Sequence, residues 1–132
     1  MELNKVYFGD CMELAKTVPD DYVDLIVTSP PYADTLSYGK EIPVFHPDNY
    51  PEWFLQLATE ASRFLKPTGS FILNINDKII SGKRSTYIYK LVCLIEEQTG
   101  LSLHDRYLWA QKSGIPTGGP RRLDDKMEYI FH

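Results

Sequence analysis

The sequence predicts an α/β fold in which helices cover both faces of a mostly parallel sheet. Two observations carry this prediction. Short strand-like segments alternate along the 132-residue chain with longer segments whose apolar residues recur at helical spacing. One strand-like segment, residues 23–28, is almost continuously apolar, as expected for a parallel strand that is buried on both faces.

The individual elements follow from local patterns. The clearest helix is expected at residues 50–65, because apolar residues recur there at helical spacing, Asn49 precedes the first turn, and Pro67 and Gly69 follow the last. In chain order, the predicted elements are strand 4–8, helix 11–17, strand 23–28, loop 33–48, helix 50–65, strand 70–75, helix 85–98, strand 103–110 and strand 127–132.

The turn that follows strand 23–28 is the most informative part of the chain. It contains Ser29, Pro30, Pro31 and Tyr32, directly after Thr28. The two prolines fix φ near −65° and remove two N–H donors, so this backbone offers mainly acceptors. Tyr32 adds a ring on which a flat group could stack. A plain strand followed by a structural proline turn is the alternative interpretation of these residues.

Polar residues also follow other predicted strands. Ligands of open α/β sheets bind beyond the carboxyl ends of the strands, where the proline turn is expected. The same edge should therefore carry Asp10, after the first predicted strand, and Asn76 with Asp77, after the third. For Asp10, a role as a helix cap is a nearly equal alternative.

Four segments in this order resemble the DNA amino-methyltransferases. The turn 28–32 resembles their catalytic motif, and the form that begins with Ser is typical of enzymes that methylate the amino group of cytosine. The adenine enzymes usually have Asp or Asn at this position. The other matching segments are 6–11 with 18–26, 65–71 and 127–132.

The resemblance implies a partial Rossmann-like fold of the S-adenosylmethionine-dependent methyltransferases. It implies that Ser29, Pro30, Pro31 and Tyr32 carry the catalysis, and that Asp10 and Thr28 contribute to cofactor binding. The substrate would be a cytosine in DNA, flipped out of the duplex and stacked on Tyr32. The implied partner is therefore DNA, as in site-specific modification enzymes that accompany restriction enzymes.

One element of the family pattern is missing from this sequence. The glycine-rich turn that holds the methionine end of S-adenosylmethionine follows a strand in these enzymes, and no such turn occurs in residues 1–132. A target-recognition region is missing as well. We therefore expect residues 1–132 to be the catalytic half of a methyltransferase domain that by itself binds the cofactor weakly or not at all.

A half-domain should expose a sheet edge. We expect strand 4–8 to be that edge, and unpaired edges favour pairing with another chain. The chain is thus expected to self-associate or to bind a complementary chain that carries the glycine-rich motif.

Composition narrows the setting of the protein. A net charge of −4 argues against a protein that coats nucleic acid non-specifically. No apolar run is long enough for a membrane span, so no membrane partner is expected. Cys11 and Cys93 fit no metal-ligand spacing and are interpreted as core residues of a reduced, cytoplasmic protein, and no metal site is expected.

Two other functions remain open at this point. The same turn could serve an enzyme that methylates adenine in DNA or a base in RNA. The chain could also be an inactive remnant, or a binding subunit of a split enzyme.

Overall fold

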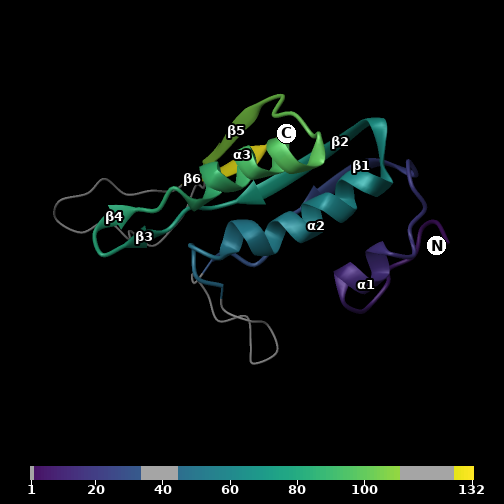
Figure 1. The fold of residues 1–132 in the computed structure, drawn as a ribbon, viewed down its shortest axis with the longest axis horizontal. Helices are drawn as coiled ribbons and strands as arrows, with labels where there is room; N and C mark the ends of the chain where they lie inside the picture. The colour runs from purple at the N-terminus through teal and green to yellow at the C-terminus, as the bar shows by residue number, and fades with distance from the viewer. Residues whose placement is uncertain (1, 34–44, 111–126) are drawn as a thin grey trace.

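The computed structural model describes residues 2–33, 45–110 and 127–132. In this part of the chain, four strands form one sheet in the order β1-β2-β6-β5, and β3 pairs with β4 in a separate hairpin (Figure 1). The bounds are α1 Cys11–Ala15, β1 Val23–Thr28, α2 Tyr50–Phe64, β2 Leu65–Ile75, β3 Ile79–Ile80, β4 Lys83–Arg84, α3 Tyr87–Thr99, β5 Arg106–Ala110 and β6 Met127–Phe131.

The sheet is mixed, with most of its strands in one direction. β1 and β2 are parallel, while β6 runs antiparallel to both of its neighbours, β2 and β5. It follows that β1, β2 and β5 all point the same way. This confirms the prediction of an α/β fold with a mostly parallel sheet.

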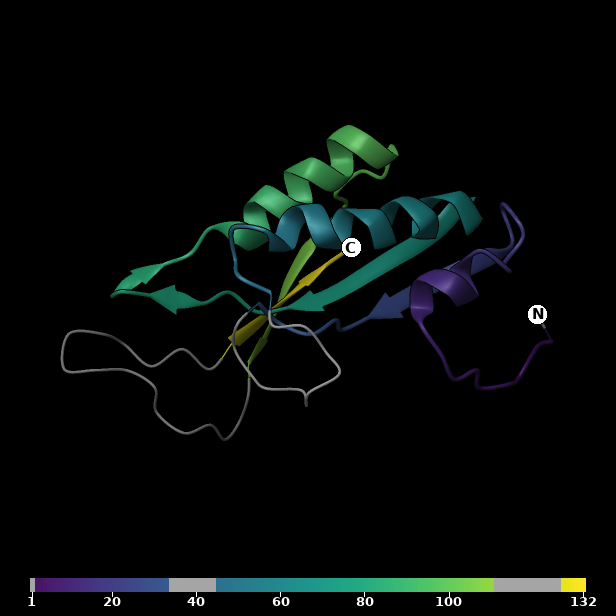
Figure 2. The same ribbon diagram turned by 60° about the horizontal axis from the view of Figure 1, so that its bottom comes forward.

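The two long helices lie side by side on one face of the sheet, where they enclose the core (Figure 2). Phe54 and Ala58 from α2 meet Ile88 and Leu91 from α3, and all four are fully buried. The strands contribute alternate residues to this core, because side chains on one face recur with a period of two. These strand residues are Leu73, Ile75 and Phe131.

The opposite face of the sheet carries partly exposed apolar side chains. Leu25 and Val27 on β1 are 53% and 66% exposed, and Tyr107 and Trp109 on β5 are 51% and 53% exposed. The described residues place no helix over these four side chains. The prediction of helices on both faces is therefore met on one face within the described part of the chain.

Two of the predictions for strands are wrong, namely the strand at 4–8 and the burial of strand 23–28 on both faces. Residues 4–8 form no strand, and Val6 and Phe8 are 82% and 94% exposed. The edge of the described sheet is instead β1, which pairs only with β2 there. The apolar run in β1 predicted burial on both faces, but within the described residues β1 has no second neighbour to cover it.

The junction after α2 also differs from the prediction. The helix ends at Phe64, and β2 begins at once at Leu65, so Pro67 and Gly69 lie inside the strand. The pairing register slips between Val23 and Leu25, whose partners are Leu65 and Ser70. This irregularity accommodates a proline that lacks an N–H donor. The loop predicted at 33–48 lies largely outside the described residues.

Both cysteines are exposed rather than part of the core. Among the described residues, no helix combines the length and the apolar character that a membrane crossing requires.

Candidate functional site

The Ser-Pro-Pro-Tyr turn lies at the carboxyl end of β1, beside β2. The parallel register pairs Thr28 with Leu73, so the turn begins level with the last residues of β2. Ser29 is exposed, Pro30 is buried, and Pro31 and Tyr32 are partly buried. Tyr32 also packs against the hydrophobic core, and this contact supports the turn.

The hydroxyl group of Tyr32 is the centre of a hydrogen-bond network. It donates to Oε2 of Glu128 at 2.7 Å and accepts from Nδ2 of Asn74 at 2.9 Å. The same Nδ2 is 2.9 Å from Oε2 of Glu128 and 3.3 Å from Oγ of Ser29. Hydrogen bonds to a carboxylate are stronger than neutral ones, so this network fixes the position of the turn.

Sequence reasoning missed Asn74 and Glu128. Asn74 follows the apolar run 71–73 in β2, and Glu128 is the one charged residue of β6, and these interruptions are the only signals that the sequence carries. Asn74 pairs with Ile130 in the β2–β6 ladder, and Glu128 lies two residues before Ile130 on the same face. The antiparallel pairing thus brings together two residues that are 54 positions apart.

A cleft opens on the other side of the turn, between α1, β1 and α2. Its volume is about 710 Å³. The walls are largely apolar and include Phe45, Trp53 and Phe71. Four of the six residues singled out from the sequence line this cleft, namely Asp10, Thr28, Pro30 and Pro31. Ser29 and Tyr32 belong instead to the neighbouring hydrogen-bond network.

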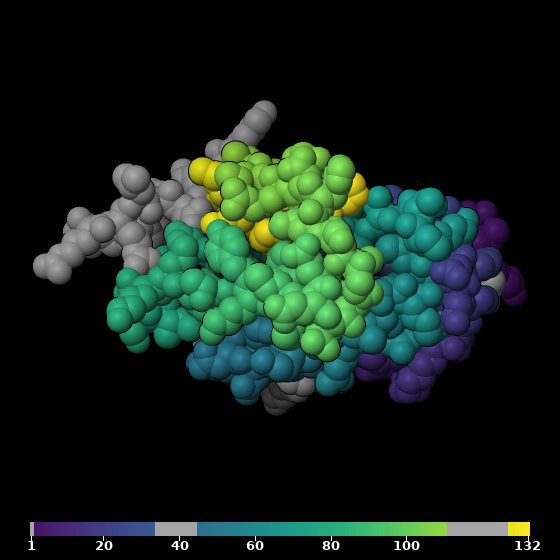
Figure 3. Space-filling view, turned by 45° about the horizontal axis from the view of Figure 1, so that its top comes forward, coloured from purple at the N-terminus to yellow at the C-terminus, as the bar shows by residue number. Residues whose placement is uncertain are grey.

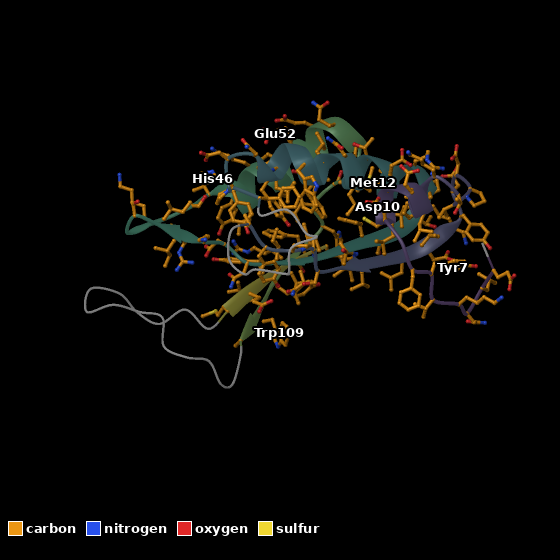
Figure 4. The ribbon with its side chains drawn as sticks, turned by 90° about the horizontal axis from the view of Figure 1, so that it is seen from below. Tyr7, Asp10, Met12, His46, Glu52 and Trp109 are labelled. Atoms are coloured by element: carbon orange, nitrogen blue, oxygen red, sulfur yellow. The ribbon has the colours of Figure 1, made fainter. Side chains whose placement is uncertain are left out.

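Asp10 has a clear structural role at the start of α1. Its Oδ1 accepts from the backbone N–H of Met12 at 2.8 Å and of Glu13 at 3.3 Å. Figure 4 shows Asp10 and Met12 close together, with Trp109 on the distant strand β5. The capping interpretation of Asp10 is therefore correct, and its position on the cleft leaves a part in binding as a proposal.

The residues after β2 form a second polar group. The Asp77 side chain is only 3% exposed and pairs with Nη1 of Arg84 at 2.5 Å. Tyr87 donates its hydroxyl hydrogen to the carbonyl oxygen of Asn76. Close by, burial and a hydrogen bond to Tyr89 raise the pKa of Tyr129 to about 12. These contacts hold the base of the β3–β4 hairpin against the core.

Metal binding has no support in the described part of the chain. No three His, Cys, Asp or Glu residues are placed there to hold an ion.

The family is decided by comparison with known proteins. The family model described as "DNA methylase", N6_N4_Mtase, matches residues 23–132. The chain belongs to this family. The match includes the turn 28–32 and every strand of the sheet described above.

Individual relatives agree with this assignment. The Type II methyltransferase M.PvuII of Proteus hauseri is 32% identical over 114 residues, which are 85% of this chain and 33% of M.PvuII. M.BglII of Bacillus subtilis is 29% identical over 86% of the chain and 31% of the relative. The DNA adenine methyltransferase YhdJ of Escherichia coli K12 is 29% identical over 59% of the chain and 27% of its own length.

Solved structures show the same fold. The PvuII DNA methyltransferase, described as cytosine-N4-specific, aligns with a TM-score of 0.79 and 27% identity over 95% of this chain and 46% of that one. TTHA0409 of Thermus thermophilus, solved with S-adenosyl-L-methionine, aligns with a TM-score of 0.69 and 21% identity over 93% and 49%. The chain thus spans about a third of the curated relatives and about half of these structures.

Proposed function

We propose that this chain supplies the catalytic part of a site-specific DNA methyltransferase that methylates the exocyclic amino group of cytosine. The observation that carries the proposal is the Ser-Pro-Pro-Tyr turn at a strand end, fixed by Asn74 and Glu128. Family membership and the cytosine-N4 specificity of the PvuII enzyme support it. The relatives are Type II methyltransferases, so a role in restriction-modification is part of the proposal.

The chemistry depends on positioning rather than on a strong acid or base. The amino nitrogen of cytosine is a poor nucleophile, because its lone pair is delocalised into the ring. The Oγ of Ser29 and the carbonyl of Pro30 would each accept one N–H hydrogen bond. These two contacts favour a pyramidal nitrogen whose lone pair points at the methyl group on the sulfonium of the donor. As the N–C bond forms, the S–C bond would break and release a neutral thioether, and the nitrogen would lose one proton to solvent.

Tyr32 would stabilise the base outside the duplex. A base inside the helix is out of reach, so it must be flipped out, which costs a few kcal/mol. Stacking on an aromatic ring recovers about 1–3 kcal/mol per base. The contacts of the Tyr32 hydroxyl with Glu128 and Asn74 would hold the ring in place before the base arrives.

S-adenosylmethionine would supply an electrophilic methyl group on its sulfonium sulfur. The cleft would suit part of this molecule, because its apolar and aromatic walls match a flat heteroaromatic ring and Thr28 is among its lining residues. Asp10 would contribute its second carboxylate oxygen there. The charged amino-acid end needs the glycine-rich turn that residues 1–132 do not contain.

A second part must therefore complete the proposed enzyme. It would be a polypeptide, or a further region of the same one, that carries the glycine-rich motif. We call the chain together with this part the active preparation. A cytoplasmic location is part of the proposal, because the free and exposed Cys11 and Cys93 would stay reduced in that compartment.

Methylation of adenine is the second candidate, because YhdJ is a DNA adenine methyltransferase. Digestion of DNA treated with the active preparation and labelled S-adenosylmethionine separates the two. We expect the label in N4-methylcytosine. Label in N6-methyladenine would establish the alternative, and no label in any nucleoside would refute both.

A further inference from the structure

The β3–β4 hairpin carries a concentration of positive charge in a chain of negative net charge. Lys78 precedes β3, and Lys83 and Arg84 form β4. The only acidic residue between Asn76 and Lys90 is Asp77, which the ion pair with Arg84 neutralises. The remaining side chains of the hairpin are neutral, so its local charge is opposite in sign to that of the whole chain, −4.

The hairpin has a defined shape. Ser81 and Gly82 form its two-residue turn with φ of 48° and 81°, the left-handed values that a tight hairpin turn requires. Ser85 donates its backbone N–H to the carbonyl of Lys78 at 2.7 Å, which closes the base of the hairpin. The buried end of the Asp77–Arg84 pair fixes that base to the core.

The hairpin projects from the same edge of the sheet as the candidate site. β2 ends at Ile75, one residue after Asn74, whose side chain contacts Ser29 and Tyr32, and the base of the hairpin at Lys78 follows three residues later. Figures 1 and 2 show the hairpin at the end of the molecule opposite to α1 and the N-terminus. In the space-filling view it extends beyond α2 at the left of the described surface (Figure 3).

The spacing suits the backbone of a nucleic acid. Lys78 follows Asn74 by four residue steps, a span of at most roughly 13 Å in extended chain. Phosphates on one strand follow each other every ~3.4 Å along the helix axis, so this span covers about four nucleotides. A base held at Ser29 and Tyr32 would therefore have its nearby phosphates within reach of the hairpin.

We infer that the β3–β4 hairpin is a contact surface for DNA phosphates that flank the target base. Lys83, which is exposed, and Lys78 supply the charge, while the Asp77–Arg84 pair positions them. The inference rests on the proposed function for its ligand. It adds a binding surface outside both the cleft and the turn, and this surface recognises the backbone of any sequence.

Salt dependence tests the inference on the 132-residue chain itself. Binding of a labelled duplex is measured by fluorescence anisotropy at several salt concentrations, for the natural chain and for the double variant Lys78→Gln/Lys83→Gln. Each lost phosphate contact makes the slope of log affinity against log salt less steep by about 0.9. We expect the slope of the double variant to be less steep by about 1.8, and its DNA affinity to be weakened equally for duplexes of unrelated sequence.

A matched control removes the same charge from the other end of the molecule. Lys5 and Lys16 lie near the N-terminus and α1, each in an exposed ion pair. Lys5→Gln/Lys16→Gln should keep the natural slope, and so should Lys83→Arg, which retains the hairpin charge. An equal fall in both double variants, an unchanged slope in the hairpin variant, or no DNA binding by the natural chain would overturn the inference. If Lys78→Gln/Lys83→Gln keeps the natural salt slope while the active preparation still methylates DNA, the inference fails and the proposed function stands.

Discussion

The hydroxyl of Tyr32 donates a 2.7 Å hydrogen bond to Oε2 of Glu128, a residue 96 positions later in the chain. Asn74 joins the pair by donating to both oxygens. Three segments, namely the proline turn, the end of β2 and the start of β6, thus share one network. Its partly buried position makes these hydrogen bonds a measurable contribution to the stability of the fold.

A double-mutant cycle should detect the contact between Tyr32 and Glu128. Tyr32→Phe and Glu128→Ala are each expected to destabilise the chain, and the coupling free energy should be about 1.5 kcal/mol, because the acceptor is charged. Urea unfolding gives the four free energies. The control cycle pairs Tyr32→Phe with Glu97→Ala, an exposed residue of α3, and should give a coupling near zero. Equal coupling in both cycles would contradict the network.

Removing Arg84 from its ion pair with Asp77 should reduce the stability of the chain more than removing the charge of Asp77. Arg84→Met leaves a buried carboxylate without its cation, and we expect a loss of about 2 kcal/mol, reduced from the value for fully buried pairs because Arg84 is 39% exposed. Asp77→Asn removes the buried charge and should cost less. Lys16→Met, which breaks an exposed pair with Glu13, should stay within about 0.5 kcal/mol. A greater loss for Asp77→Asn than for Arg84→Met in urea unfolding would refute this account.

Tyr129 should make stability depend on pH in the alkaline range. Burial raises its pKa from 10 to about 12 in the folded chain, so the folded state holds the proton more tightly than the unfolded one. This contribution is complete below pH 10 and is lost as pH rises from 10 towards 12. Tyr129→Phe should show a shallower fall of unfolding free energy over that range than the natural chain, whereas Tyr22→Phe should not. Parallel curves for Tyr129→Phe and the natural chain would count against it.

The exposed strand β1 should mediate self-association. Within the described residues β1 pairs on one side only, and this open edge, together with the exposed side chains of Leu25 and Val27, favours pairing with another chain. Sedimentation velocity at several concentrations should show association of the natural chain and a weaker one for Leu25→Lys/Val27→Lys. The control Leu103→Lys changes an exposed leucine between α3 and β5. A monomer at all concentrations, or equal effects of both variants, would refute the role of β1.

The sequence was a good guide where structure depends on neighbouring residues. The strand that ends at Thr28, the helix that begins beside Asn49 and the turn 29–32 were all found from local apolar spacing and proline chemistry. The same reasoning placed the turn at the carboxyl edge of a sheet, because that is where a strand leads into a connection.

Contacts between segments far apart in the sequence could not be predicted from local patterns. Asn74 and Glu128 meet only because of the β2–β6 register, which no local pattern specifies. The exposure of Val27 could not be predicted either, because an apolar run indicates burial without naming the neighbour that provides it. The start of β2 was predicted too late, at residue 70, because Pro67 indicates the end of a helix. In the structure the irregular pairing register allows a proline inside this strand.

The central claim is that the turn 29–32 receives the target base, with the ring of Tyr32 as its support. The direct test is the single-turnover rate of methyl transfer to DNA by the active preparation with Tyr32→Phe and Tyr32→Ala. Tyr32→Phe keeps the ring but loses the hydroxyl contacts with Glu128 and Asn74, so it should lower the rate less than Tyr32→Ala does. Tyr32→Ala should lower it by roughly 5- to 150-fold, which corresponds to about 1–3 kcal/mol of stacking. Tyr7→Ala, at a partly exposed tyrosine near the N-terminus, should leave the rate unchanged. A natural rate in folded Tyr32→Ala would contradict the claim.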